Sequence, residues 1–154
     1  MSAEQPGLAA RIDADLKQAM RSQDNIAKLA LRAVKTALTE ATKTGSNQGL
    51  NDDQVMAVVQ REAKRRREAA AEYDKVGATA AGDQERAELA VLEKYLPRQL
   101  TEAEVEALAR EVISETGAAS VKDLNKVMPV MISRVAGSAD GKMVSQVVRR
   151  LLGP

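Results

Sequence analysis

The sequence predicts an all-α protein with two lobes, one of about four helices in residues 1–97 and one of three helices in residues 98–154. Apolar residues recur at i, i+3, i+4 and i+7 along most of the 154-residue chain, which is the period of amphipathic helices. Glycines and prolines separate these stretches, and no stretch of convincing length alternates as a strand would. Residues 96–101 form the expected hinge.

The first two helices are defined by apolar stripes with polar boundaries. Apolar residues at helical spacing over 8–20 predict the first helix, and a second stripe covers 26–41. Asp24 precedes the second stripe as an N-cap, because its carboxylate can accept a hydrogen bond from a free N–H of the first turn. Gly45 ends this helix, and the polar, glycine-rich stretch 45–49 predicts a loop.

The third and fourth helices complete the first lobe. Asn51 and Gln54 have the spacing of a capping box, so a long helix is expected to begin here and to end at Gly77. Apolar residues over 89–96 predict a fourth helix, which Pro97 ends because proline cannot continue a helix.

The second lobe opens with another capping-box signature, formed by Thr101 and Glu104. An unbroken apolar stripe over 105–113 follows and predicts a helix that Gly117 closes. Ser120 is then expected to cap the sixth helix.

The sixth and seventh helices cover 124–135 and 144–151. Pro129 lies off the apolar stripe of the sixth helix but removes a backbone donor, so a kink or a split is expected there. Asp140 can cap the seventh helix. The β-branched run 144–148 could also form a strand, but the helical register of the residues after it favours a helix.

The composition excludes several kinds of active site. There are no cysteines and no histidines, so disulfides, thiolate nucleophiles, imidazole bases and the common zinc sites are absent. Carboxylates could hold magnesium or calcium in principle, but no motif supports a metal or any other cofactor. We expect no catalytic residues and no release of ammonia from glutamine, because that hydrolysis needs an activated nucleophile.

The rarity of aromatic residues restricts how the chain could bind nucleic acid. It has no Phe, no Trp and two Tyr, and its net charge is +1. Stacking of bases on aromatic rings, which single-strand binders use, is therefore not available to any extent. Contact with RNA would have to be made to the backbone, through a local basic patch.

Two segments suggest phosphate or nucleic-acid binding but have simpler interpretations. Residues 61–67 contain five cations, yet Glu62 lies four residues before Arg66, a spacing typical of ion pairs on a solvated helix face. The segment Gly137–Lys142 resembles a phosphate-binding loop, but its glycines are too close and no strand precedes it. A structural turn followed by an N-cap is the favoured interpretation.

The strongest candidate for an anion-binding surface is the C-terminal end. After Gly117 the sequence has six cations and two anions, whereas the helix before it has five glutamates and one arginine. The lobe is therefore electrically polarised. The candidate RNA-binding residues, each as a phosphate contact, are Lys122, Lys126, Arg134, Lys142, Arg149 and Arg150.

No segment suggests a membrane or a secretory route. The first seven residues are polar, without the apolar core of a signal peptide, and no run of about 18 apolar residues exists. We expect a cytoplasmic protein that contacts no membrane.

Several short strings together resemble the GatB/YqeY family. They are VLEKYLPRQL at 91–100, Lys126-Val-Met128, GSADGK at 137–142, and the helix with Val144 and Val148. Their order and spacing agree with the family from about Leu8 to Leu152.

The resemblance implies a helical N-terminal lobe followed by a three-helix lobe. In the aspartyl/glutamyl-tRNA amidotransferase, a glutamine-dependent carbon–nitrogen ligase, the similar region is the C-terminal appendage of the GatB chain, which helps to hold the tRNA while other domains carry the chemistry. The resemblance implies a tRNA-binding accessory protein. The alternatives are a protein–protein adaptor, which would use the exposed face of the third helix, and a partner that completes an amidotransferase.

Overall fold

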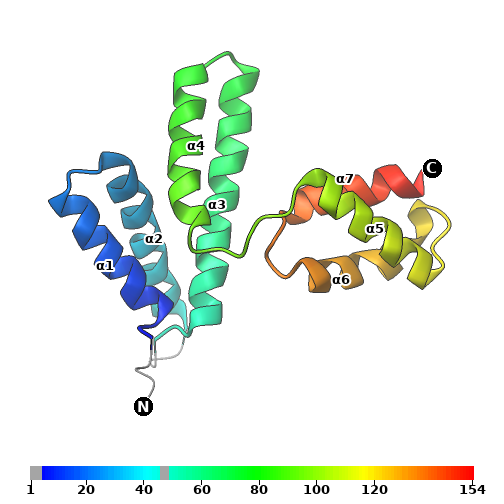
Figure 1. Cartoon of the computed structure of the whole chain (residues 1–154), viewed down its shortest axis with the longest axis horizontal. Coiled ribbons are helices and arrows are strands. Elements are labelled where there is room, and N and C mark those ends of the chain that lie inside the picture. Colours follow the sequence, from blue (N-terminus) through cyan, green and yellow to red (C-terminus); the bar gives the residue numbers. More distant parts are fainter. Residues whose placement is uncertain (1–4, 46–48) are drawn as a thin grey trace. The chain divides into compact units, whose positions relative to one another are not determined.

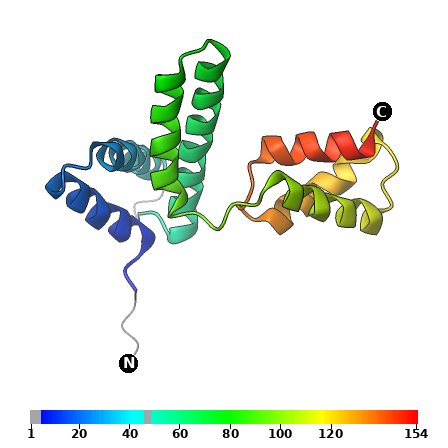
Figure 2. The ribbon, with the colours of Figure 1, turned by 45° about the horizontal axis from the view of Figure 1, so that its top comes forward.

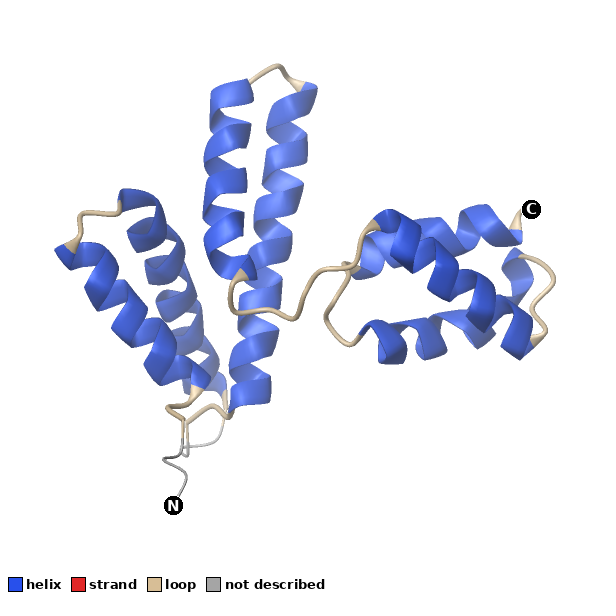
Figure 3. Ribbon diagram, viewed as in Figure 1, coloured by secondary structure: helices blue, strands red, loops and turns tan. Residues whose placement is uncertain are grey.

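The computed structural model describes residues 5–45 and 49–154, and within these ranges every regular element is a helix (Figures 1 and 3). The prediction of an all-α fold with seven α-helices is confirmed. A short 3₁₀ helix, Val121–Asp123, precedes the sixth. The α-helices are α1 (Leu8–Arg21), α2 (Asn25–Thr44), α3 (Asp52–Lys75), α4 (Thr79–Glu93), α5 (Glu102–Thr116), α6 (Leu124–Val135) and α7 (Gly141–Leu152).

The chain divides into two compact units, which we call unit 1 (Met1–Leu96) and unit 2 (Pro97–Pro154). In unit 1, α1 with α2 and α3 with α4 form two antiparallel hairpins (Figures 1 and 2). Unit 2 contains α5, α6 and α7, each of which contacts the other two. No helix in the described ranges is both long enough and apolar enough to cross a bilayer.

Side-chain caps begin three of the helices, as the sequence predicts. The Asp24 carboxylate accepts a hydrogen bond from the backbone N–H of Ala27, at 3.0 Å. Both halves of the Asn51–Gln54 capping box are formed, each at 2.9 Å. The Thr101–Glu104 box is also complete, with bonds of 2.8 and 3.2 Å. These bonds satisfy backbone donors that the first turn of a helix leaves free.

Other predicted helix ends need correction. The Ser120 hydroxyl accepts from the N–H of Lys122 and therefore begins the 3₁₀ helix rather than α6. Asp140 occupies the N-cap of α7, but its side chain makes no capping hydrogen bond. The predicted end of the third helix needs none, because α3 ends at Lys75 and Gly77 follows it in the left-handed conformation, at φ 73°, that terminates a helix.

Of the kink or split expected at Pro129, the split is wrong, because α6 runs unbroken through the proline. Val127, Met131 and Val135 are buried on both sides of the proline. Their packing holds the helix to the core despite the loss of one backbone donor.

The core of unit 1 is built from apolar residues of all four helices and the segment after α4. Its largest members include Ile12, Leu31 and Leu92. Tyr95 adds a polar contact at the edge, where its hydroxyl donates a hydrogen bond to the Asp15 carboxylate. Burial is the main cause that raises the pKa of this hydroxyl, so it stays protonated and able to donate.

The core of unit 2 is formed by one buried stripe from each of its three helices. Those of α5 and α7 include Val105, Val112, Val144 and Val148. The run 144–148 is therefore helical, as the register predicted.

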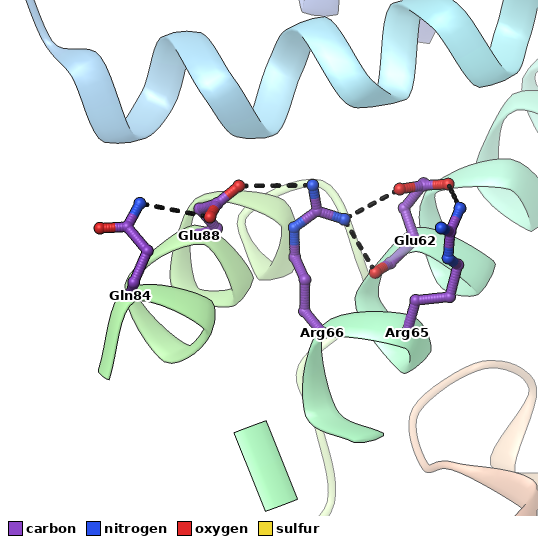
Figure 4. Close-up of polar contacts among 5 residues, drawn as sticks. All are labelled: Glu62, Arg65, Arg66, Gln84 and Glu88. Carbon is purple, nitrogen blue, oxygen red and sulfur yellow. Dashed lines mark hydrogen bonds and ion pairs between the residues drawn. The ribbon is translucent and has the colours of Figure 1, made fainter. Parts of the chain in front are cut away.

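The charged run of α3 is not entirely a solvated face, which corrects that interpretation. Arg66 and Glu62 are buried, with 8% and 7% of their surface exposed. One terminal nitrogen of Arg66 donates to the Glu62 carboxylate at 2.9 Å and to the Glu62 carbonyl at 3.1 Å. The other donates to Glu88 of α4 at 3.5 Å. Figure 4 shows the Arg66 guanidinium between the two carboxylates, facing α2.

Candidate nucleic-acid interface

The six predicted phosphate contacts all lie in unit 2 and all have exposed side chains. The structure separates them into two sets according to whether a carboxylate pairs with them. We call these sets the paired cations and the free cations. The paired cations are Lys126, Arg134 and Arg150, and the free cations are Lys122, Lys142 and Arg149.

Two of the paired cations connect α6 and α7 to the acidic helix α5. Both terminal nitrogens of Arg134 bond to the Glu115 carboxylate. Arg150 bonds to Glu102 at 2.8 Å and to Glu106 at 2.9 Å. These hydrogen bonds raise the pKa of Arg134 and of Arg150, so both guanidinium groups are charged at neutral pH.

The third paired cation has a local partner. The Lys126 ammonium lies 3.5 Å from the Asp123 carboxylate, three residues earlier. Asp123 itself accepts a backbone hydrogen bond from Ala119, which is the main cause that lowers its pKa. Asp123 is therefore ionised at neutral pH, and Lys126 faces a permanent negative charge.

The free cations form no ion pair with any residue in the ranges that the structure describes. Lys142 and Arg149 share one face of α7, with Ser145 between them at helical spacing. The Arg149 Nε donates to the Ser145 hydroxyl at 3.3 Å. Arg149 lies seven positions after Lys142, so the two cations are about 10 Å apart along the helix axis.

This face of α7 points away from the core of unit 2. Val144, Val147 and Val148 are buried on the opposite side of the helix. Arg149 also lies in the last turn, where a cation complements the helix dipole, whereas Lys142 lies in the first turn, where it does not. The position of Lys142 is thus not explained by helix stability.

The segment Gly137–Lys142 is a structural turn. Ala136 and Gly137 both have left-handed backbone conformations, at φ 43° and 83°. The N–H of Leu100 donates to the Ser138 carbonyl at 2.7 Å, and the Gln99 amide donates to the Gly137 carbonyl at 3.2 Å. The loop therefore uses its polar groups to hold the start of unit 2, which agrees with the favoured interpretation.

Sequence reasoning identified the cations but not their partners. The excess of glutamates in the helix before Gly117 was a signal that charges would pair across the lobe, but only the fold shows that Arg134 and Arg150 are the ones paired. The sequence did not predict that Arg66 and its partners are buried, although the Glu62–Arg66 spacing indicated the ion pair. No group of three or more carboxylates in the described ranges is arranged to hold a metal ion.

Comparison with known proteins gives one finding on relationship. A family model described as Yqey-like protein matches residues 9–152, which is nearly the whole chain. No curated protein sequence matches it. The match covers both units and includes every helix from α2 to α7 in full. This chain therefore belongs to the YqeY-like family.

Proposed function

We propose that the protein is a tRNA-binding accessory protein that contacts the RNA backbone through unit 2. The observation that carries the proposal is the exposed face of α7, where Lys142 and Arg149 have no carboxylate partner among the described residues and Ser145 lies between them. Two cations and a hydroxyl along one helix face supply hydrogen-bond donors, and phosphate oxygens accept hydrogen bonds from such groups. Lys122 adds a third free cation in the same unit.

The mode of binding follows from the composition. With two Tyr and no Phe or Trp, the chain has almost no rings on which bases could stack. Structured RNA can instead be bound through its backbone and shape. A folded tRNA, which presents double-helical backbone on its outside, suits such a surface. The proposal assigns no catalytic step to this chain.

The paired cations have a secondary role in the proposal. Exposed ion pairs are weak, because water and salt screen them and long side chains lose freedom in forming them. A phosphate group can therefore replace Glu115 on Arg134, or Glu102 on Arg150. The free cations make the first contacts with the RNA, before any phosphate group replaces a glutamate on a paired cation.

The salt dependence of tRNA binding tests the proposal. Each neutralised phosphate lowers the logarithm of the affinity by roughly 0.7–0.9 per tenfold increase in salt, so three free cations predict a slope of about −2 to −3. The double substitution Lys142→Ala and Arg149→Ala removes two of these contacts and should flatten the slope by about 1.5. Fluorescence anisotropy with labelled tRNA measures the slope.

A matched control uses two exposed cations of unit 1, Lys64 and Lys94, which have no partner in the described ranges. Replacing both with Ala should leave the slope unchanged. Circular dichroism should show the same helix content for both double variants. The proposal fails if no tRNA binds at low salt, or if the unit 1 substitutions flatten the slope as much as those on α7.

A further inference from the structure

A groove in unit 1 is separate from the proposed RNA surface. Residues of α2, α3 and α4 line it, and its volume is about 900 Å³. On the α2 side the lining includes Ala33, Ala37 and Ala41, which are half-buried and recur every four residues along one face. Alanine side chains end at Cβ and lose no rotamer freedom when covered, so another helix could approach this face closely at low entropic cost.

The α3 side of the groove contains the buried guanidinium of Arg66. Its two terminal nitrogens are bonded to Glu62 and Glu88, but its Nε–H is buried and has no acceptor among the described residues. The bond to Glu88 is long, at 3.5 Å. A buried donor without a partner is costly, so the polar network beside the groove does not satisfy all of its own donors.

The groove also holds unpaired charges of both signs. Arg61 on α3 and Glu85 on α4 line it, and neither has a hydrogen-bonding or ionic partner among the described residues. The lining contains three arginines and four glutamates in all. That balance gives no attraction to a polyanion such as RNA, whereas a protein surface with one acidic and one basic group can satisfy both free charges.

The length of the groove matches a short helix. The lining residues of α2 run from Ala33 to Thr44, and those of α3 run from Val58 to Ala69. Each span covers eleven helical steps, or about 16 Å at 1.5 Å per residue. Two walls of this length, one of them carrying the three alanines beside Glu40 and two threonines, fit about three turns of an added helix.

We propose that this groove binds an amphipathic helix of about three turns from a partner protein. The apolar side of that helix packs on Ala33, Ala37 and Ala41. An acidic side chain of the partner pairs with Arg61, and a basic one pairs with Glu85. This is the helix-in-groove mode of recognition, in which apolar anchors supply affinity and flanking charges fix the orientation.

A displayed library of helical 15-residue peptides, selected against the full-length protein, provides the probe. The peptides carry a fixed seam of small apolar residues, and the flanking positions are randomised. We expect enriched peptides with one acidic and one basic flank. Binding should shift the methyl NMR signals of the three groove alanines in protein labelled at alanine methyls.

Two sets of variants locate the binding site. Ala37→Gln with Ala41→Gln places longer side chains in the groove and should weaken the selected peptides at least about tenfold. Thr39→Gln with Thr42→Gln makes the same change on exposed positions of α2 outside this groove and should leave the affinity unchanged. Arg61→Glu should also weaken binding, and a peptide whose acidic residue is replaced by lysine should restore it.

The following results would overturn the proposal. One is a set of selected peptides that bind equally well to the Ala37→Gln/Ala41→Gln variant. Another is self-association of the wild-type chain, seen by sedimentation and lost in that variant, which would make a second copy the occupant. A third is a shift of the groove alanine signals on addition of tRNA, which would make RNA the occupant.

Discussion

Arg66 is the residue whose environment differs most from what its sequence neighbours suggest. Five cations lie within seven residues, yet Arg66 alone among them is buried, because α4 brings Glu88 to the side opposite Glu62. Sequence spacing identified one of the two partners. The other is 22 residues away, and its approach depends on how the α3–α4 hairpin packs.

Substitution of Arg66 should be strongly destabilising. Arg66→Met leaves the buried Glu62 paired only with Arg65 and leaves the mostly buried Glu88 without a cation. Loss of one partner from a buried pair costs roughly 3 kcal/mol. Arg65→Met is the control, because Arg65 also pairs with Glu62, at 3.2 Å, but its own side chain is 76% exposed and water screens its charge. Urea unfolding followed by circular dichroism measures both. Equal stability of the two variants would mean that the Arg66 network does not hold the hairpin.

The carboxylate of Glu104 makes the folding stability of the protein depend on pH. The backbone N–H of Thr101 donates to its carboxylate, and this bond is the main cause that lowers its pKa from the usual 4.5. Because the folded pKa is the lower one, the stabilisation is present above pH 4.5 and is lost as the pH falls through the folded value.

The variant Glu104→Gln keeps a side-chain acceptor for the capping box but removes the charge. We expect wild type to be more stable than this variant at neutral pH, with the difference shrinking below pH 4.5. Thermal unfolding between about pH 3 and pH 7 measures the difference. A difference that stays constant down to the lowest pH would show that the charge of Glu104 contributes nothing to the start of α5.

At the scale of the element, the sequence predicted most of the architecture because helices depend on local signals. The capping residues Asp24, Asn51 and Thr101 and the left-handed Gly117 were all identified from spacing alone. The failures occurred where tertiary packing decides. α6 continues through Pro129 because three buried residues hold it, and Ser120 begins a 3₁₀ turn rather than an α-helix.

The candidate site was predicted less completely than the helices, for a physical reason. A count of charges along the chain locates the basic residues, but pairing depends on which helix faces lie side by side. Arg149 and Arg150 are adjacent in the sequence, yet Arg150 turns toward Glu102 and Glu106 while Arg149 bonds to Ser145 of its own helix. Arg149 and Arg150 differ in their partners only because α7 packs against α5.

At the scale of the whole molecule, the chain combines two units that each have their own core. Residues of unit 1 pack among themselves, and the same holds for unit 2. The two proposed surfaces also lie on different units, with the free cations on unit 2 and the helix-binding groove on unit 1.

This division predicts that a fragment of residues 97–154 carries the RNA-binding activity alone. Its ten buried apolar residues form a core of their own, and many domains of about 60 residues fold alone with marginal stability, so the fragment should unfold cooperatively. Because Lys122, Lys142 and Arg149 all remain, its tRNA affinity should show the same salt slope as the full chain, about −2 to −3. Circular dichroism first establishes that the fragment is folded, and anisotropy titrations then give the slope. A folded fragment with a slope near zero would place the RNA contacts in unit 1, where the fragment 1–96 should then reproduce them.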